Sequence, residues 1–592
     1  MNFSASSSPR LLILLLGLNC ISLIAQNKHD FNWILGTPNN SNPYIGGNLI
    51  DFGHGNLLIQ DRDLPVDMWY PSIISDESGR LEFYANGCKI FNREDILLEN
   101  GDEINAGDIY ESYCNDPGSS VGYPSYQGHL LLPYPDHPNQ YFYFHTWVDD
   151  VYLARKLLYS LVDMNANGGL GKVEAKNQLI LEDTLSWAIT ATRHANGRDW
   201  WIVTARDTSS LYYVIKLDNG GVHTPNIQIP DSSWIPGHVV ALSNVFSSDG
   251  SKFVRFGGDS PTAFRMYHFD RCNGQFYDPV TIHLPDTICY GPWGCFSPNS
   301  RFLYVQNNGD KLYQFDTWAS DINASIQLVG IYDGFKGMYG LSTRFNSLTL
   351  GPDQRIYMSC RSGVNFVHTI HHPDEPGLQC DFRQHDLELF SPYPFYLSNM
   401  PFYRLYNLQG SSCDSLNIQT PMVAYWRYEQ DSVSGPTEID FTDISYHQPA
   451  NWHWDFGDGF TSSEQSPTHH YSSPGKYNVC LTVCNAVGNC DTLCKELEIK
   501  TVGTSERPFE KPPFLVYPNP VIDYMVIEPN EEQTLGFIQI FNMQGQAASI
   551  NPLRVSANQV WLDLHALDSG VYYLKVYSND KVFSHLFVKV ED

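Results

Sequence analysis

The sequence predicts an all-β protein in which a six- or seven-bladed β-propeller is followed by two β-sandwich domains. Aromatic residues make up 14% of the 592 residues, and 44 glycines and 36 prolines supply turns between many short strands. No stretch of convincing length shows the apolar periodicity of an amphipathic helix. The expected parts, in order, are a signal peptide, the propeller, a linker, a sandwich, a second linker and a second sandwich, at residues 1–25, 30–407, 408–419, 420–500, 501–513 and 514–592.

The first 25 residues have the pattern of a secretory signal peptide. Arg10 supplies a positive charge, residues 11–18 form an apolar core, and cleavage is expected after Ala25. The apolar run is too short to cross a bilayer, and no later stretch approaches eighteen apolar residues, so no transmembrane segment is expected. Cys20 stands where a lipid anchor would attach, but Asn19 precedes it where that signal needs a small residue.

The charge and the cysteine count fit an exported protein. A formal net charge of -29 argues against a nucleic-acid partner, because phosphate binding requires clustered lysine and arginine. Cys20 is one of 13 cysteines, so twelve remain after signal cleavage. An even number of cysteines in an oxidising compartment predicts disulfide bonds.

A turn-rich phrase followed at once by an apolar strand recurs along the propeller region. The strands are expected to start at Leu81, Tyr141, Trp200, Phe253, Phe302 and Ile356. Their spacing of roughly fifty to sixty residues is the period of a four-stranded propeller blade. Each turn is expected to join the innermost strand of a blade to its second strand. The last three copies resemble a phrase of YVTN-type and lactonase-like propellers, which is structural and carries no chemistry. A seventh blade would be composite, with Pro43–Ile59 closing against Phe395–Tyr406.

A second motif lies in the sequence NWHWDFGDG, which begins at Asn451. Its residues are Trp454, Asp455, Phe456, Gly457, Asp458 and Gly459. The motif resembles that of the PKD domain, which implies an Ig-like β-sandwich that acts as a spacer or a binding module. Trp454 and Phe456 are expected to point into the core, with a tight turn after them. Asp455 and Asp458 are the candidates for a calcium site, although Asp in such a turn more often bonds its own backbone.

Four cysteines of this module share one hairpin. An antiparallel pairing around the loop 485–489 places Cys480 opposite Cys494 and Cys484 opposite Cys490 in a single register. Cross-strand neighbours lie close enough for disulfide bonds. The alternative is a four-thiolate zinc site, but zinc ribbons favour the tighter C-x₂-C spacing. The sequence therefore predicts two bridges rather than a metal site.

The last domain carries three motifs in order. They contain Tyr517, Pro518, Asn519, Pro520, Gly545, Gly570, Tyr572 and Lys575. These motifs resemble the type A C-terminal sorting domain of the type IX (Por) secretion system of Bacteroidetes, so both C-terminal domains are expected to be Ig-like β-sandwiches. The resemblance implies that the type IX machinery reads the domain. It also implies that a sortase removes the domain and couples the chain to lipopolysaccharide, and the polar, proline-rich linker 501–513 suits such processing.

No catalytic motif stands out in the propeller region. His368, His371 and His372 form a local cluster, but His371 would face away from the other two on a strand. Trp200 and Trp201 could stack on sugars, although one of the pair must face the packing core. The acidic candidates for a cation at the channel mouth are Asp61, Asp63, Asp67, Asp149 and Asp150.

Two classes of function follow. The first is a secreted or surface-anchored binding or adhesion protein whose propeller recognises a glycan or a protein. The alternative is a hydrolase, lactonase-like or glycan-cleaving, with its chemistry in the propeller channel. Converging acidic, histidine or asparagine side chains at the channel mouth would favour the hydrolase, and an apolar or plugged channel would favour binding. No catalytic residue is named, and no cofactor is expected beyond the calcium alternative.

Overall fold

The computed structural model of the chain consists of two compact units, Met1–Ile499 and Lys500–Asp592. It describes residues 27–38, 46–53, 57–115, 122–233, 243–257, 263–286, 292–307, 309–337, 340–393, 396–416, 418, 422–430, 437–447, 449–499, 514–517, 521–529, 538–542, 547–548, 551–556, 559–578 and 581–590. The predicted signal peptide and the linker 501–513 lie outside these residues. So do four residues of the sorting motif, Pro518, Asn519, Pro520 and Gly545.

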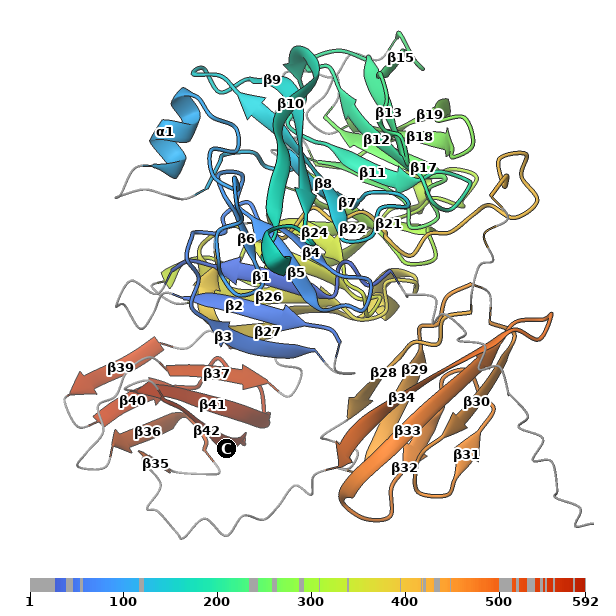
Figure 1. Ribbon diagram of the computed structural model, residues 1–592. Helices are drawn as coiled ribbons and strands as arrows, with labels where there is room; N and C mark the ends of the chain where they lie inside the picture. Colours follow the sequence, from blue (N-terminus) through green and yellow to red (C-terminus); the bar gives the residue numbers. More distant parts are fainter. Residues whose placement is uncertain are drawn as a thin grey trace, which may run out of the picture. The chain divides into compact units, whose positions relative to one another are not determined.

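Seven antiparallel sheets follow one another over the described part of residues 32–393 (Figure 1), and we call this region the sheet array. In each sheet the strands pair in chain order, apart from β15, which pairs with β13. The first four sheets contain β1 (Asn32–Gly36), β2 (Gly47–Asp51) and β3 (Leu58–Arg62); β4 (Ser72–Ser75), β5 (Leu81–Ala85) and β6 (Ile90–Asn92); β7 (His129–Pro133), β8 (Gln140–Val148), β9 (Ala154–Asp163) and β10 (Lys172–Leu185); and β11 (Thr190–Arg193), β12 (Trp200–Ala205), β13 (Tyr212–Asp218), β14 (Gly221–Val222) and β15 (Asn226–Gln228). The last three contain β16 (Asn244–Phe246), β17 (Lys252–Phe256), β18 (Ala263–Asp270) and β19 (Gln275–His283); β20 (Trp293–Phe296), β21 (Phe302–Asn307), β22 (Lys311–Asp316) and β23 (Gln327–Ile331); and β24 (Phe345–Leu350), β25 (Ile356–Cys360), β26 (Val364–Ile370) and β27 (Phe382–Tyr393).

The six turn phrases occupy the same place in six of these sheets. Each leads into the second strand of its sheet, and β5, β8, β12, β17, β21 and β25 all begin within one residue of the expected starts. Most of the turns contain a residue with positive φ two or three positions before the expected start. Gly79, Gly197 and Gly250 hold this position in three of them, because glycine adopts positive φ without a steric penalty. The turn chemistry therefore sets where each second strand begins.

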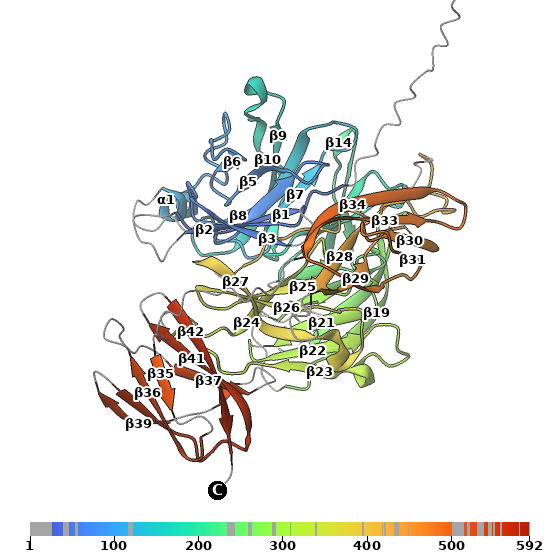
Figure 2. The same cartoon turned by 90° about the horizontal axis from the view of Figure 1, so that it is seen from below.

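The prediction for the seventh blade is wrong. Strands β1, β2 and β3 form a sheet of their own, and residues 396–406 form no strand. Strand β27 of the last sheet instead contacts all three strands of the first sheet (Figure 2). The Ser391 amide donates to Asn48 Oδ1 at 3.1 Å, and Asn48 Nδ2 donates to the Ser391 carbonyl at 3.0 Å. The series of sheets therefore returns to its start.

Neighbouring sheets cover both faces of the second strands. Every residue of β5, β12, β17, β21 and β25 is buried. The sequence of a strand that is buried on both faces is a nearly continuous apolar run rather than an alternation of apolar and polar residues. This explains why sequences such as WWIVTA, at Trp200–Ala205, follow the turn phrases. The first strands also contact their neighbours, β1 with β4, β4 with β7, β11 with β16, β16 with β20 and β20 with β24.

Disulfide bonds are confirmed in the array, but the cysteines do not all pair. Two bridges are present, Cys88–Cys114 and Cys272–Cys413. Three other cysteines, Cys295, Cys360 and Cys380, are buried thiols outside these bridges. An even cysteine count therefore does not imply complete pairing here; Cys295 and Cys380 even belong to the same apolar core cluster without a bridge between them.

The next domain consists of two facing sheets. One contains β28 (Trp426–Gln430), β29 (Glu438–Asp443) and β32 (Thr468–His470), and the other contains β30 (Asn451–Asp455), β31 (Thr461–Ser462), β33 (Gly475–Cys484) and β34 (Cys490–Ile499). Trp426 and Trp454, one from each sheet, meet in the core with ring centroids 5.6 Å apart. Trp454 and Phe456 are buried as the motif predicts, and Gly457 and Gly459 take positive φ in the turn.

The cysteine hairpin has the predicted register. Cys480 lies opposite Cys494, and Cys484 lies opposite Cys490. Both pairs are disulfide-bonded, with Cα atoms 4.0 and 4.1 Å apart. The bonded sulfurs leave no thiolate for the alternative zinc site.

The second unit is a separate pair of four-stranded sheets. One contains β35 (Phe514–Tyr517), β36 (Tyr524–Pro529), β39 (Asn551–Ser556) and β40 (Gln559–Asp563), and the other contains β37 (Ile538–Asn542), β38 (Ala547–Ala548), β41 (Gly570–Ser578) and β42 (Lys581–Lys589). Met525 and Leu562 from the first sheet share a core with Ile540, Leu574 and Phe587 from the second. The unit is therefore a small β-sandwich, as the alternation predicts.

Helical structure is scarce in the described residues. It comprises α1 (Asp108–Cys114) and the short 3-10 helices η1 (Asn167–Gly169), η2 (Asn323–Ser325) and η4 (Gly377–Cys380). No helix in the described part of the chain is long and apolar enough to span a membrane.

Candidate functional site

The centre of the sheet array is occupied by the chain itself. The innermost strand of a sheet has an edge whose backbone groups need partners. Residues 396–406, which we call the central segment, supply them. Asn399 Nδ2 donates to the carbonyls of His129 and Ile189, both at 2.9 Å. The Tyr403 hydroxyl donates to the Leu131 carbonyl at 2.8 Å. The central segment thus satisfies carbonyls of the inner strand β7 and of Ile189, the residue just before the inner strand β11.

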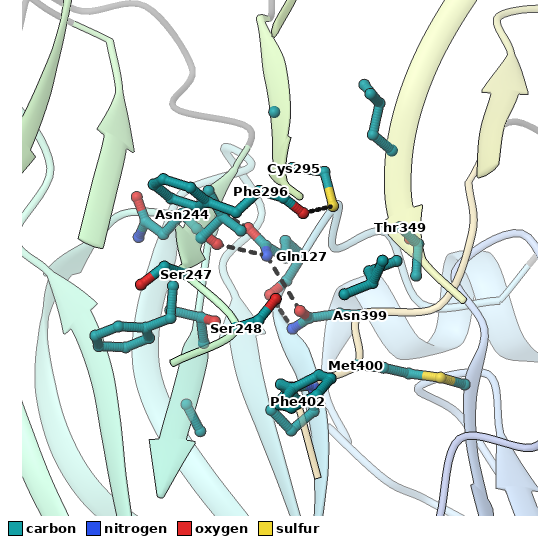
Figure 3. Close-up of a pocket in the computed structure, with 18 of the residues that line it drawn as sticks. Gln127, Asn244, Ser247, Ser248, Cys295, Phe296, Thr349, Asn399, Met400 and Phe402 are labelled. Atoms are coloured by element: carbon teal, nitrogen blue, oxygen red, sulfur yellow. Dashed lines mark hydrogen bonds between the residues drawn. The ribbon is translucent and has the colours of Figure 1, made fainter. Parts of the chain in front are cut away.

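Gln127 connects the central segment to a third inner strand. Its Nε2 donates to the Asn244 carbonyl at 2.8 Å and to Asn399 Oδ1 at 3.1 Å (Figure 3). The Asn244 amide donates back to Gln127 Oε1 at 2.7 Å. These three residues were not anticipated from the sequence. The available signal was a single polar residue beside the start of an inner strand, as Asn244 is at the start of β16.

A cavity of about 80 Å³ remains beside this network. Strands β11, β16, β20 and β24 line it together with residues 398–402 (Figure 3). Pockets for organic ligands usually measure roughly 300–1,000 Å³. This cavity has room for a few water molecules. Among the described residues, the chain therefore fills most of the centre of the array.

The ionisable groups of the cavity are engaged in the fold. Asp30 lines it, and both of its carboxylate oxygens accept hydrogen bonds from Arg404, at 2.5 and 2.7 Å. Burial raises the pKa of the Cys295 thiol to about 12, so the thiol is protonated at neutral pH and is a poor nucleophile. Both groups serve the packing of the array.

The histidine cluster divides between two environments. His368 is fully buried, and its Nε2 lies 2.8 Å from the Thr343 carbonyl and 3.3 Å from the Cys360 sulfur. Burial lowers the pKa of His368 to about 3, so the ring is neutral. His371 instead lies against carboxylates of two domains, with Nε2 2.7 Å from Asp386 and Nδ1 3.6 Å from Glu429. Neither histidine reaches the cavity lining.

Three of the remaining candidates, Trp200, Trp201 and Asp149, are engaged in the fold. Trp200 and Trp201 are both buried, at 0% and 9% exposure, so neither offers a face to a sugar. Asp149 pairs with Arg155 at 2.7 Å. Asp67 is half-buried, and burial raises its pKa to about 6. No group of three or more His, Cys, Asp and Glu side chains in the described residues is placed to hold a metal ion.

The two aspartates of the PKD motif bond to the protein. Asp455 Oδ1 accepts from the Gly457 amide at 2.9 Å, and Asp458 Oδ1 accepts from the Phe460 amide at 3.1 Å. Asp458 Oδ2 also lies 2.7 Å from His469 Nε2. The carboxylates thus hold the turn and the neighbouring strand β32.

The first sandwich is docked onto the sheet array through buried polar contacts. Arg427, 5% exposed, donates to the carbonyls of Asp353 at 2.7 Å and His371 at 2.8 Å. Arg355 donates to Glu429 at 2.5 Å. Tyr425 packs into the same apolar cluster as residues of β1, and its hydroxyl donates to the Phe52 carbonyl at 3.0 Å. The two domains therefore form a continuous body.

The described residues of the sorting motif lie mainly on β41. Tyr572 is buried, its ring stacks on Phe587, and its hydroxyl donates to the Asp568 carbonyl at 2.9 Å. Gly570 begins the strand, and the Lys575 ammonium lies 5.3 Å from the centre of the Phe541 ring. Tyr517 ends β35. In this sandwich Tyr572 is a core residue, and Lys575 belongs to the opposite face of the strand.

Two segments of the chain match known domain families. Residues 421–501 match the PKD domain, and residues 515–590 match the secretion system C-terminal sorting domain. The matches confirm the PKD domain and the C-terminal sorting domain that the motifs indicate. The sorting domain indicates export, so the protein reaches the outside of the cell or its surface.

Similarity to individual proteins is local or distant. A microbial collagenase of Vibrio alginolyticus is 42% identical over 53 residues, which are 9% of this chain and only 6% of the collagenase. The crystal structure of the PKD1 domain from the Vibrio cholerae metalloprotease PrtV is 28% identical, with a TM-score of 0.13, over 14% of this chain and 99% of that domain. A putative 6-phosphogluconolactonase from Bacteroides fragilis is 12% identical, with a TM-score of 0.35, over 62% of this chain and 98% of that one.

Proposed function

We propose that this protein is an exported binding or adhesion protein, secreted or held at the cell surface, and that its sheet array is a seven-bladed β-propeller. Consecutive antiparallel meanders whose first strands adjoin, and whose last sheet meets the first, support a propeller. On this proposal the propeller spans 30–407, the PKD domain 420–500 and the sorting domain 514–592. Its ligand is a surface glycan or a protein.

The observation that carries the binding function is the plugged centre of the array. In a hydrolase of this architecture the channel would have to admit a substrate. Here Asn399 and Tyr403 bond to inner-strand carbonyls, and Arg404 holds the Asp30 carboxylate. Displacing the central segment would leave these buried groups without partners, at a cost of about 1–3 kcal/mol for each neutral group. Recognition is therefore assigned to the surface of the array.

The PKD domain would present the propeller rather than act as a loose spacer. Its contacts through Arg427, Arg355 and Tyr425 fix its position on the array. The linker 501–513 then separates this body from the sorting domain, which the type IX machinery would read. Removal of that domain by a sortase and attachment to lipopolysaccharide would leave propeller and PKD domain together at the surface.

This function is tested by measuring ligand binding and ligand cleavage in the same samples. The purified full-length chain is titrated with neutral and anionic oligosaccharides and with proteins from the surfaces of neighbouring cells, and each ligand is recovered and analysed by mass spectrometry. Saturable binding with intact ligand is the expected result. Cleaved oligosaccharide, or opening of a sugar lactone by the same preparation, would overturn the proposal in favour of the hydrolase.

A further inference from the structure

Five aromatic rings converge at one end of the sheet array. We call them the aromatic mouth: Tyr70, Tyr126, Trp187, Trp293 and Tyr396. Tyr70 stacks on Tyr396 with ring centroids 5.4 Å apart. Tyr126 lies 5.6 Å from Tyr396 and 5.1 Å from Trp187, and Trp293 lies 5.8 Å from Tyr396. The rings form one continuous group, centred on Tyr396.

The rings come from equivalent points of the array. Tyr70, Tyr126 and Trp187 stand two or three residues before the first strands β4, β7 and β11, and Trp293 is the first residue of β20. Tyr396 follows β27 and is the first residue of the central segment. Each ring therefore stands where the chain enters an inner strand or the centre. Trp293 also lines the central cavity, so the aromatic mouth lies at one end of that cavity.

One side of the aromatic mouth is supported by α1. Trp187 packs against an apolar cluster that contains Ile109 and Tyr110 of this helix. The bridge between Cys88 and Cys114 ties the end of α1 to the hairpin that follows β5. A disulfide next to a ring cluster holds the rings in place before any ligand arrives, which lowers the entropy cost of binding.

Most side chains of the aromatic mouth are less buried than those of a protein core. Tyr70, Tyr126, Trp187 and Tyr396 are only half-buried. Tyrosine and tryptophan combine an apolar ring with a polar O–H or N–H group. The aromatic mouth thus offers ring faces together with groups that can donate hydrogen bonds.

We propose that the aromatic mouth binds a neutral carbohydrate, with a pyranose ring stacked on its aromatic faces. The proposal rests on the binding function proposed above and names its ligand class. The C–H face of a pyranose is apolar and packs on an aromatic ring, while its equatorial hydroxyls accept and donate hydrogen bonds at the rim. Tyr70, Tyr126 and Trp187 supply both kinds of contact.

The charges favour an uncharged ligand. Burial raises the pKa of Tyr70 and of Tyr396 above their usual range, so both phenols stay protonated and neutral. The chain as a whole carries a formal charge of -29, which repels polyanions such as acidic glycans at low ionic strength. A neutral sugar avoids this repulsion.

In the test, the purified full-length chain is titrated with neutral hexasaccharides of glucose, xylose, mannose and N-acetylglucosamine, and binding is measured by tryptophan fluorescence and calorimetry. At least one should bind. With that sugar, Tyr126→Ala and Trp187→Ala should each weaken binding about 2- to 12-fold, the equivalent of one aromatic contact of about 0.5–1.5 kcal/mol. Tyr126→Phe keeps the ring and loses the hydroxyl, so its affinity should fall less than that of Tyr126→Ala.

Trp318→Ala and Tyr277→Ala are the matched controls, because these rings are 63% and 47% exposed elsewhere on the array. They should bind like the parent chain. Melting temperatures within a few degrees of the parent show that a variant is folded, and Tyr126→Phe provides the comparison if an alanine variant fails to fold. Binding of none of the neutral sugars, or equal affinity of all variants, would overturn the proposal. Binding of only a protein or an anionic glycan would overturn it while leaving the proposed binding function intact.

Discussion

Arg404 and Asp30 form a buried bidentate ion pair that joins the two ends of the sheet array. Arg404 Nη2 lies 2.7 Å from Asp30 Oδ2, and each side chain is only 4% exposed. Asp30 stands two residues before β1, and Arg404 belongs to the central segment that follows β27. The pair therefore ties the start of the array to its end.

Removing one partner of this pair should strongly destabilise the first unit. Arg404→Met leaves the Asp30 carboxylate buried without its cation, and we expect the free energy of unfolding in urea to fall by about 3–5 kcal/mol. The double variant Arg404→Met/Asp30→Leu should recover most of that loss. Lys476→Met is the control, because the Lys476–Glu496 pair is 63% and 64% exposed and should contribute at most about 1 kcal/mol. An Arg404→Met chain as stable as this control would contradict the role of the pair.

The docking of the PKD domain should depend on pH through His371. Burial alone would lower the pKa of His371, but its contacts with Asp386 and Glu429 raise it above the usual value. A raised pKa adds stability that is complete below about pH 6.5 and is lost as the pH rises through the pKa of the folded protein. The contact with His371 also holds the pKa of Glu429 well below its usual range. The stability that this contact contributes is therefore lost in strong acid, where Glu429 becomes protonated.

Urea unfolding of the first unit at a series of pH values between 4 and 9 measures this effect. The parent chain should lose stability above about pH 6.5 relative to His371→Gln, which cannot titrate. Glu429→Gln removes one carboxylate partner of His371, so it should also weaken the pH dependence of the free energy of unfolding. Parallel curves for the parent chain and His371→Gln would show that His371 does not couple docking to pH.

The disulfides should differ in how much their removal lowers the free energy of unfolding. In the chain-entropy description, the bridges Cys480–Cys494 and Cys484–Cys490 close short loops, with sequence separations of 14 and 6, and each should contribute about 2–3 kcal/mol. Cys272–Cys413 spans a separation of 141 and should contribute on the order of 4–5 kcal/mol. Paired Cys→Ala variants compared in urea measure the difference. Peptide mapping without reduction that recovered Cys480 or Cys484 as free thiols would contradict the pairing.

The sequence alone predicts the structure correctly where interactions between residues close in the chain determine it. Gly79 and Gly250 mark turns because few other residues take positive φ, and Cys480 with Cys494 fixed a hairpin register because both lie on one face. The seventh sheet was beyond such reasoning. Whether residues 396–406 pair as a strand or cross the centre depends on contacts such as Asn399 with Ile189, which are distant in the sequence.

The aromatic mouth shows the same limit. Trp200 and Trp201 drew attention because they are adjacent, yet both are buried between sheets. Tyr126, Trp187 and Trp293 are far apart in the sequence and come together only because they stand at or just before different inner strands. The signal that the sequence contained was an aromatic residue two or three positions before the first strands β4, β7 and β11.

The destination of a chain that lacks residues 517–592 decides whether the C-terminal domain is an export signal. When the chain is expressed with residues 517–592, fractionation should find it in the medium or on the cell surface, and mass spectrometry should find a new C-terminus between Lys500 and Val516. A periplasmic reporter fused to residues 500–592 should be exported as well. We expect the truncated chain to stay in the periplasm. Undiminished secretion of the truncated chain would contradict the assignment of the sorting domain, and with it the export on which the proposed binding function depends.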